Sequence, residues 1–237
     1  MRNIRKRLSS ERFASILLKI LRMAHCFLLR AKLLFEIQSL GKGCKVFPGL
    51  IISGGKNIRI GKNCFIGRNV LLDASGGLIT IGDNVEIRDN VRIYSGNVSI
   101  EAGVTLGEGA FLNGTITIRE KAWIARGCDI TGTILIEQAI LGPQVSIAGG
   151  RGHQRDPETQ RIVLSCGDLS RTPANLPNAG IRVLAGSWVG QGAILLKEVT
   201  INRNMVVGAG SVVTKSFPEG AVVAGNPAKP IVSKLSL

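Results

Sequence analysis

Residues 183–224, taken six at a time, are VLAGSW, VGQGAI, LLKEVT, INRNMV, VGAGSV, VTKSFP and EGAVVA. The first residue is Val, Leu or Ile in six consecutive groups, and the fifth is small or apolar. The same frame occurs upstream in IGKNCF and IGRNVL from Ile60, IGDNVE and IRDNVR from Ile81, IEAGVT and LGEGAF from Ile100, IREKAW and IARGCD from Ile118, and IEQAI and LGPQVS from Ile136. An internal repeat of this kind decides the fold class before any other feature.

A period of six fits neither a helix nor the two-residue alternation of a simple strand. It fits an all-β solenoid in which three short strands form a coil of about 18 residues, with one aliphatic side chain per strand pointing inward. Gly, Asn and Asp follow the aliphatic positions, and we expect them to form the corners because they adopt positive φ at little cost. The segment around Gly77–Gly82 is expected to be a corner loop. The repeat predicts a solenoid over residues 41–228, within a domain of residues 41–237, whereas a β-sandwich would not keep this phase.

The composition agrees with an interior of stacked aliphatic side chains. Hydrophobic residues are 45% of the chain, but aromatic residues are only 4%, and there are 30 glycines. The five cysteines are scattered and lack CxxC spacing, which argues against a disulfide framework or a zinc site and fits a reducing compartment. We therefore expect no metal centre.

The basic charge is concentrated at the start of the chain. Residues 1–59 hold 13 Lys and Arg against two acidic residues, whereas residues 60–237 hold 17 against 14. The head segment, residues 1–40, is therefore treated separately from the repeat. It lacks an apolar stretch that ends in a small-residue cleavage site, so no signal peptide is expected. Nucleic acid is also not expected, because no aromatic residues interleave with the basic ones.

Residues 10–36 predict one amphipathic α-helix. Apolar residues such as Phe13, Ile16, Leu17 and Ile20 follow helical spacing, and Arg and Lys line the opposite face. Charges within every ten residues exclude a transmembrane span. Two roles stay open for residues 1–36, which are binding to an anionic membrane surface and capping of the first coil.

The repeat is interrupted once, by the polar segment 151–182, which contains three prolines. A loop of this length inside a compact domain is typically functional or disordered. It contains His153, one of the two histidines in the chain. An imidazole near its ordinary pKa accepts a proton from a weak nucleophile such as a hydroxyl, so His153 is a candidate general base. The plain alternative is a solvated loop histidine.

The C-terminal sequences WVGQGAILLKEVTIN (188–202), VVGAGSVVTKSFPEG (206–220) and VVAGNPAKPI (222–231) resemble the hexapeptide-repeat acyltransferases, and the maltose and galactoside O-acetyltransferases in particular. The resemblance implies a left-handed parallel β-helix, a homotrimer with active sites between neighbouring β-helices, and acetyl-CoA lying along the coils. It favours a catalytic His153, because the family's histidine follows a coil that ends like SIAGG. The acid that orients this histidine stays open among Asp156, Glu158 and Asp168.

The resemblance also implies roles for residues of the repeat. The backbone N–H of Gln191 would stabilise the oxyanion, although the family commonly has a small residue there. The acetyl-CoA residues would be Trp188 at the pantetheine or adenine, Ala209 and Gly210 where the backbone approaches the pantetheine, Thr214 and Lys215 at the adenine end and its phosphates, and Lys229 at a second phosphate. Asn113, where the family often has a sugar-facing Asn, and Tyr94, which lies off the repeat phase, are candidates for acceptor binding, with structural roles as the alternative.

The function that the sequence favours is an acetyl-CoA-dependent O-acetyltransferase that acts on a sugar hydroxyl of a cell-surface polysaccharide or its lipid-linked precursor. The membrane-directed helix favours such an acceptor and a cytoplasmic protein bound peripherally to the inner face of the cytoplasmic membrane. A small soluble acceptor and a non-catalytic assembly scaffold are the alternatives. Serine acetyltransferases carry a larger N-terminal helical domain than about 40 residues can form. The γ-class carbonic anhydrases need three zinc-binding histidines, and this chain has two histidines.

Overall fold

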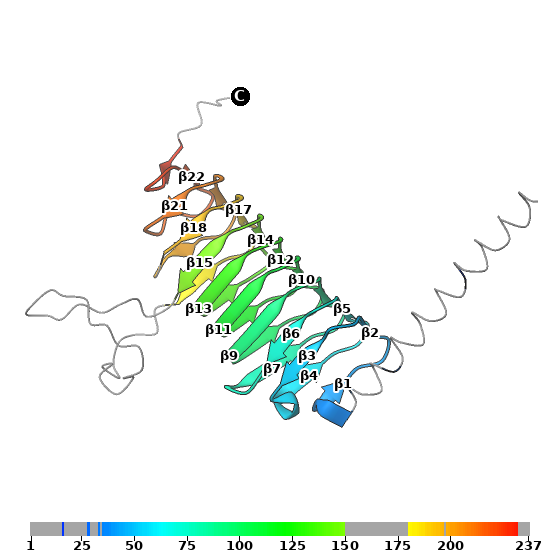
Figure 1. Cartoon of the computed structure of the whole chain (residues 1–237). Helices are drawn as coiled ribbons and strands as arrows, with labels where there is room; N and C mark the ends of the chain where they lie inside the picture. The colour runs from blue at the N-terminus through cyan, green and yellow to red at the C-terminus, as the bar shows by residue number, and fades with distance from the viewer. Residues whose placement is uncertain are drawn as a thin grey trace, which may run out of the picture.

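The chain forms an all-β, left-handed solenoid whose coils stack along one axis, as Figure 1 shows for a computed structural model. The structure describes residues 16, 28, 33, 35–149, 180–196 and 198–231. The predicted β-solenoid is confirmed. It begins slightly earlier than predicted, because Ser39 and Leu40 already pair with Arg59 and Ile60 of the next coil.

Three flat faces, here called I, II and III, enclose the core. Face I consists of β2 (Lys45–Val46), β5 (Phe65–Ile66), β8 (Glu86–Ile87), β10 (Thr105–Leu106), β12 (Trp123–Ile124), β14 (Ile140–Leu141), β17 (Trp188–Val189), β20 (Val206–Val207) and β22 (Val222–Ala224). Face II consists of β3 (Ile51–Ser53), β6 (Leu71–Asp73), the first halves of β9 (Arg92–Ile100), β11 (Phe111–Ile118) and β13 (Asp129–Ile136), and then β15 (Ser146–Gly149), β18 (Ile194–Leu195) and β21 (Val212–Val213). Face III consists of β1 (Ser39–Leu40), β4 (Ile58–Ile60), β7 (Leu78–Ile81), the second halves of β9, β11 and β13, and then β16 (Ile181–Val183) and β19 (Thr200–Ile201).

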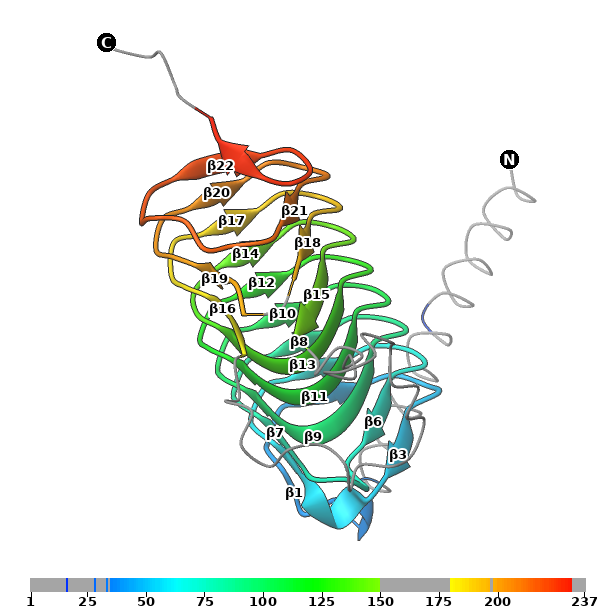
Figure 2. The same cartoon turned by 90° about the vertical axis from the view of Figure 1, so that its left-hand side faces the viewer.

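Neighbouring coils are joined by parallel strand pairing on all three faces. Arg182 pairs with Thr200, so the coil in this part of the chain has the length that the repeat predicts. The early coils are longer, since Ile58 pairs with Ile79. A short 3-10 helix at Gly55–Asn57 adds to the first of them. Figure 2 shows β9, β11 and β13 curving round the edge between faces II and III. At the far end β23 (Lys229–Pro230) pairs antiparallel with β22.

The core is filled from two positions of each six-residue group. The first position is buried wherever it is Val, Leu or Ile, as at Val183, Val189 and Leu195, and it is exposed at Glu219 of the last group. The fifth position is buried as well, as at Ser187 and Ala193. The expectation of one inward side chain per strand was therefore incomplete. The narrow interior holds a large aliphatic residue at the first position and mostly a smaller residue at the fifth.

Two other positions of the group form the corner, and only one of them has positive φ. This corrects the prediction that the Gly, Asn and Asp residues after the aliphatic position all serve as corners through positive φ. The fourth residue of the group has positive φ, for example Asn63 at 55° and Gly109 at 67°. Where the second residue is glycine, as at Gly107, the reason is different. A Cβ on Gly107 would lie 2.5 Å from the backbone N of Arg126 in the next coil. A glycine at the second position thus lets stacked coils approach closely. The fourth position is mostly Asn or Gly because the chain turns there with positive φ, and Lys121, Gln144 and Glu198 adopt the same conformation in three coils.

Two further sequence predictions need correction. The segment predicted as a corner loop at Gly77–Gly82 contains β7, which pairs with β4 and β9 on face III. The interruption predicted at 151–182 ends earlier, because Ile181 and Arg182 belong to β16 and pair with β13. Both segments carry buried aliphatic residues in alternation, and such alternation is a strand pattern.

The N-terminal end of the core is closed by Leu33 and Ile37, which are both 3% exposed. The amide of Ile37 donates a hydrogen bond to the carbonyl of Leu33. These two residues therefore cap the first coil. The side chains of Ile16 and Leu28 are exposed, and most of the predicted helix 10–36 lies outside the described residues. In the described part of the chain, no helix has the length and apolarity to cross a bilayer.

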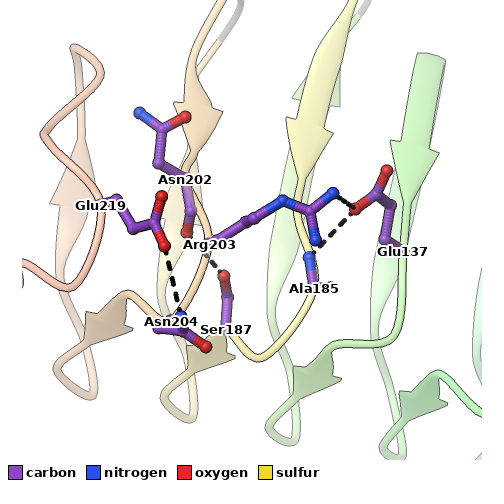
Figure 3. Close-up of polar contacts among 7 residues, drawn as sticks. All are labelled: Glu137, Ala185, Ser187, Asn202, Arg203, Asn204 and Glu219. Carbon is purple, nitrogen blue, oxygen red and sulfur yellow. Dashed lines mark hydrogen bonds and ion pairs between the residues drawn. The ribbon is translucent and has the colours of Figure 1, made fainter.

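Polar contacts of Glu137 join the coil before the interruption to the two coils after it (Figure 3). The Glu137 carboxylate accepts a hydrogen bond from the backbone N–H of Ala185 at 3.2 Å and pairs with the Arg203 guanidinium at 3.2 Å. The Ser187 hydroxyl donates to the carbonyl of Asn202 at 2.8 Å. The two Glu137 contacts join the coils on either side of the interruption, and the Ser187 bond joins the two coils that follow it.

Candidate active site

Gly149 and Gly180, the described residues on either side of the interruption, lie at one point on the II/III corner. Gly114, Gly132 and Gly149 are successive partners in this corner. A Cβ on Gly149 would lie 3.3 Å from the Thr133 carbonyl oxygen, and one on Gly180 would lie 2.5 Å from the same atom. Both ends of the interruption therefore pack against Thr133, where only glycine lets the chain pass so close. We call this point the loop base.

The predicted catalytic residue belongs to the interruption itself. His153 and the acids proposed to orient it, Asp156, Glu158 and Asp168, lie outside the described residues. His153 follows Gly149 by four residues, a span of at most about 14 Å for any chain. Its catalytic role stays a prediction.

The structure brings the two predicted acceptor residues together on the same corner. Tyr94 pairs with Asn113, although the two residues belong to different coils. Asn113 in turn pairs with Thr131, and Thr131 with Ala148 beside the loop base. On its other side, Tyr94 pairs with Asp73 of the preceding coil. These five residues form a single outward column, here called the corner column.

An aromatic pair lies beside the corner column. The rings of Tyr94 and Phe111 are 5.6 Å apart between centroids, with an interplanar angle of 49°. Ile93 and Leu112 point into the core and are fully buried. Strand alternation therefore places the aromatic rings on the outer surface of face II, where each is half-buried.

The predicted acetyl-CoA residues fall on separate parts of the solenoid. Trp188 lies on face I with 54% of its surface exposed. Gln191 and Ala209 are stacked on the I/II corner. The side chain of Gln191 donates to the Gln144 side-chain oxygen at 3.5 Å, and the amide of Gly210 donates to the carbonyl of Gln191 at 2.8 Å. The φ of Gly210 is 66°, so this glycine also has the turn-forming role of the fourth position.

The remaining acetyl-CoA candidates lie further round the last coils. Thr214 and Lys215 follow β21 at the II/III corner, and both are exposed. The Lys215 ammonium lies 5.6 Å from the centre of the Phe217 ring, so it has a cation–π partner within its own chain. Lys229 is exposed in β23, outside the parallel stack. Within one chain, the width of face II separates Gln191 and Ala209 from Lys215 and the loop base.

Sequence reasoning missed several outward residues of the same surfaces. Asp73 and Thr131 join the corner column through strand register alone, and Phe111 lies beside that column on face II. On face I, Trp123 and Ile140 are exposed and occupy the same register position as Trp188. The sixth position of each group points outward, so following that position along the repeat would have revealed the apolar stripe on face I.

Among the described residues, the pKa values of three groups depart from their ordinary values. Two hydrogen bonds from Ser75 lower the pKa of Asp73. Burial raises the pKa of the Cys64 and Cys128 thiols to about 11. In the described part of the chain, no three His, Cys, Asp or Glu side chains gather where they could hold a metal ion.

The proteins of similar sequence include acetyltransferases. No known family profile matches the chain. It is 30% identical over 124 residues to galactoside O-acetyltransferase of Lactococcus lactis, covering 52% of this chain and 50% of that protein. It is 34% identical over 117 residues to serine acetyltransferase 4 of Arabidopsis thaliana, covering 48% and 28%. The chain thus spans half or less of the length of these relatives, whose names confirm the resemblance to hexapeptide-repeat acetyltransferases.

Solved structures of low sequence identity also align with the solenoid. UDP-N-acetylglucosamine acyltransferase from Campylobacter jejuni is 16% identical, with a TM-score of 0.48 and coverage of 79% of this chain and 74% of that one. A variant of perosamine N-acetyltransferase from Caulobacter crescentus, solved with CoA and GDP-perosamine, is 19% identical, with a TM-score of 0.37 and coverage of 79% and 56%.

Proposed function

We propose that this chain is a hexapeptide-repeat acyltransferase that transfers an acetyl group from acetyl-CoA to a hydroxyl group of a sugar. Its sequence relatives are acetyltransferases, one of which is named for a galactoside acceptor. Its C-terminal coils carry the VGAGSVVTK and AGNPAK sequences that resemble the acetyl-CoA-using enzymes. No nucleotide-hydrolysis motif in the sequence competes with this interpretation.

The observation that carries the proposal is that Gly149, where the described chain stops before His153, lies on the same corner as Asn113. The interruption that contains His153 follows Gly149, and Asn113 lies two strands away in the corner column. Two strand spacings amount to about 10 Å. The four residues from Gly149 to His153 span up to about 14 Å, so a histidine from this loop can reach a sugar that lies between the loop base and Asn113.

The chemistry then needs only groups that the chain can supply. The neutral imidazole of His153 accepts the proton of the acceptor hydroxyl as its oxygen attacks the thioester carbonyl. The new C–O bond forms, the C–S bond breaks, and CoA leaves as a thiol that takes up the proton from the imidazolium. A backbone N–H donor, for which Gln191 is the candidate, stabilises the oxyanion in between. The donor is already an activated thioester, so the reaction requires no metal.

We also propose a homotrimer. The groove candidates Gln191 and Ala209 lie on the I/II corner, whereas the loop base lies on the II/III corner. A second copy that docks its II/III corner beside the I/II corner of the first would complete the site. Such a copy would also cover the exposed apolar stripe of Trp123, Ile140 and Trp188 on face I, which supports the proposal.

The acceptor that we propose is a sugar of a cell-surface polysaccharide or of its lipid-linked precursor. The support is the basic head of the chain, since residues 1–36 would hold the enzyme at the cytoplasmic face of an anionic membrane. A small soluble acceptor remains the alternative substrate, and a non-catalytic scaffold is the alternative from another class of protein.

The test compares His153→Ala with Lys215→Ala. We expect His153→Ala to lower turnover by about 10²–10⁴, the usual contribution of a general base, while acetyl-CoA affinity stays within a few-fold. Its pH profile should lose an ascending limb near neutrality that the unaltered enzyme shows. Lys215→Ala should raise the KM for acetyl-CoA with less effect on kcat, because phosphate contacts bind ground and transition states alike. Near-normal turnover of His153→Ala would exclude the mechanism, and full cellular function without turnover would favour the scaffold.

A further inference from the structure

The corner column is longer than one sugar requires. Counted from Ala148 at the loop base, its members are Thr131, Asn113, Tyr94 and Asp73, each one coil further away. Neighbouring strands are about 4.8 Å apart, so Asn113 is about 10 Å from the loop base, Tyr94 about 14 Å and Asp73 about 19 Å. A hexose ring is about as wide as one strand spacing, so a single sugar at the loop base does not contact Tyr94.

The chemistry of the column suits a carbohydrate along its whole length. Thr131 offers a hydroxyl, Asn113 an amide and Asp73 a carboxylate, which are the groups that hydrogen-bond sugar hydroxyls. Tyr94 and Phe111 add half-buried rings, and aromatic faces provide large, rigid apolar contact at little cost in conformational entropy. An apolar platform flanked by a few polar groups is the usual composition of a small-molecule site.

The charge of this surface restricts the kind of glycan. The face II strands carry three charged residues in their described parts, Asp73, Arg92 and Asp129. Two of these are acidic, and hydrogen bonds from Ser75 keep Asp73 in its ionised form. Along the described strands of face II a polyanionic glycan would find no basic track, whereas an uncharged glycan meets no opposing charge there.

We propose that the acceptor is an uncharged glycan several sugars long, which lies along the II/III corner with its reacting sugar at the loop base and its other sugars over Asn113 and the Tyr94–Phe111 pair. This inference rests on the proposed acetyl transfer and adds the length and charge of the acceptor. In this arrangement Tyr94 acts as a distal binding residue rather than as part of the reacting site.

The experiment uses the full chain and size-fractionated fragments of one to six sugars. The probes are prepared from the neutral surface polysaccharide of the producing cell after chemical removal of ester groups, and transfer from radiolabelled acetyl-CoA is measured. We expect kcat/KM to rise about tenfold from one sugar to four and then to level off, which corresponds to one good aromatic contact. Tyr94→Ala should lower kcat/KM for the tetrasaccharide about tenfold more than for the monosaccharide.

Two variants serve as controls. Tyr94→Phe keeps the aromatic platform and should retain the length dependence. Ser99→Ala changes an outward residue of the same strand on face III and should leave every kcat/KM unchanged. Acetyl transfer that is independent of length, or a Tyr94→Ala effect equal at all lengths, would overturn the extended acceptor and leave the acetyltransferase standing. Absence of transfer to every fragment would instead overturn the proposed function itself.

Discussion

Two cysteines of the core show how burial changes the chemistry of a side chain. Cys64 and Cys128 occupy the inward fifth position, and their thiols donate to the carbonyls of Gly82 at 3.1 Å and Gly142 at 3.3 Å. Burial in an aliphatic interior penalises the thiolate, which raises both pKa values to about 11. These thiols therefore fill space in the core and are poor nucleophiles at neutral pH.

The raised pKa values predict a specific labelling pattern. With iodoacetamide at pH 8, we expect Cys64 and Cys128 to remain unmodified in the folded protein and to react fully after unfolding in guanidinium chloride. The thiolate fraction at pH 8 is about 10⁻³ for a pKa near 11, and access requires opening of a coil. Peptide mass spectrometry measures the modification at each cysteine. Rapid labelling of either residue in the folded chain would show that its coil opens readily.

The same shift predicts how stability depends on alkaline pH. The unfolded thiols ionise near their ordinary pKa of 9.0, whereas the folded ones hold their protons to about pH 11. Between these values the unfolded state binds fewer protons, so the free energy of unfolding should fall as pH rises. Urea unfolding curves from pH 8 to 10.5 check this, with a Cys64→Ala, Cys128→Ala double variant as the control. An equal slope in that variant would assign the pH dependence to other groups.

At the scale of one turn, two glycines of the repeat are required for different reasons. Gly107 and Gly109 occupy the same turn between β10 and β11. A Cβ on Gly107 would overlap the backbone of Ala125 and Arg126, whereas a Cβ on Gly109 would meet nothing within 4 Å. Gly109 has positive φ instead, like the asparagines at the equivalent place in other coils.

This difference predicts opposite outcomes for two substitutions in one turn. Gly107→Ala should destabilise the fold by about 3 kcal/mol, because two stacked backbones would have to separate. Gly109→Asn should be nearly neutral, within about 0.5 kcal/mol, because Asn tolerates this conformation well. Free energies of unfolding from urea titration decide between them. A Gly109→Asn variant as unstable as Gly107→Ala would contradict the assignment of separate roles to the two positions.

For the whole molecule, the buried Leu33 limits how many N-terminal residues can be removed without exposing the core. Removal of residues 1–36 would take Leu33 from the end of the core and expose the first coil. Residues 1–30 can be removed without touching Leu33 or Ile37, and they contain eight of the basic residues. Truncation at residue 30 therefore separates membrane binding from capping.

We expect the chain lacking residues 1–30 to stay folded and to lose binding to vesicles that contain phosphatidylserine. Each basic residue near such a surface contributes about 1 kcal/mol, so removal of eight should abolish sedimentation. Salt should weaken binding of the full chain, because it screens the basic face. Sedimentation with vesicles measures binding, and circular dichroism of the truncated chain is the control for folding. Undiminished sedimentation of the truncated chain would place the membrane contact elsewhere.

The proposed assembly makes a separate prediction. Light scattering in mild detergent should give three times the chain mass of 25.2 kDa. Ile140→Glu, which places a charge in the apolar stripe of face I, should yield monomers and abolish acetyl transfer. Thr80→Glu on the outer surface of face III is the matched control and should remain trimeric. A stable monomer with full activity would exclude both the trimer and the shared site.

The sequence by itself determined the solenoid and the first inward position of each group, whereas the structure added the buried fifth position and the separate roles of the two corner positions. Each group of six carries its own inward aliphatic residue, as at Val183, and its own turn, so the pattern is local and can be recognised without knowing any long-range contact. The resemblance of residues 206–231 to acetyltransferases likewise needed only the order of residues.

Only the tertiary structure decided which residues meet across the coils. Tyr94 is a neighbour of both Asn113 and Asp73, but these two partners lie at unequal distances from it along the chain. Coils of unequal length and a bulge beside Gly114 shift the register, so the partner of an outward residue cannot be counted from the repeat. The corner column exists because backbone hydrogen bonds between coils fix that register, and a six-residue pattern specifies which side chains point outward without specifying what lies above or below them.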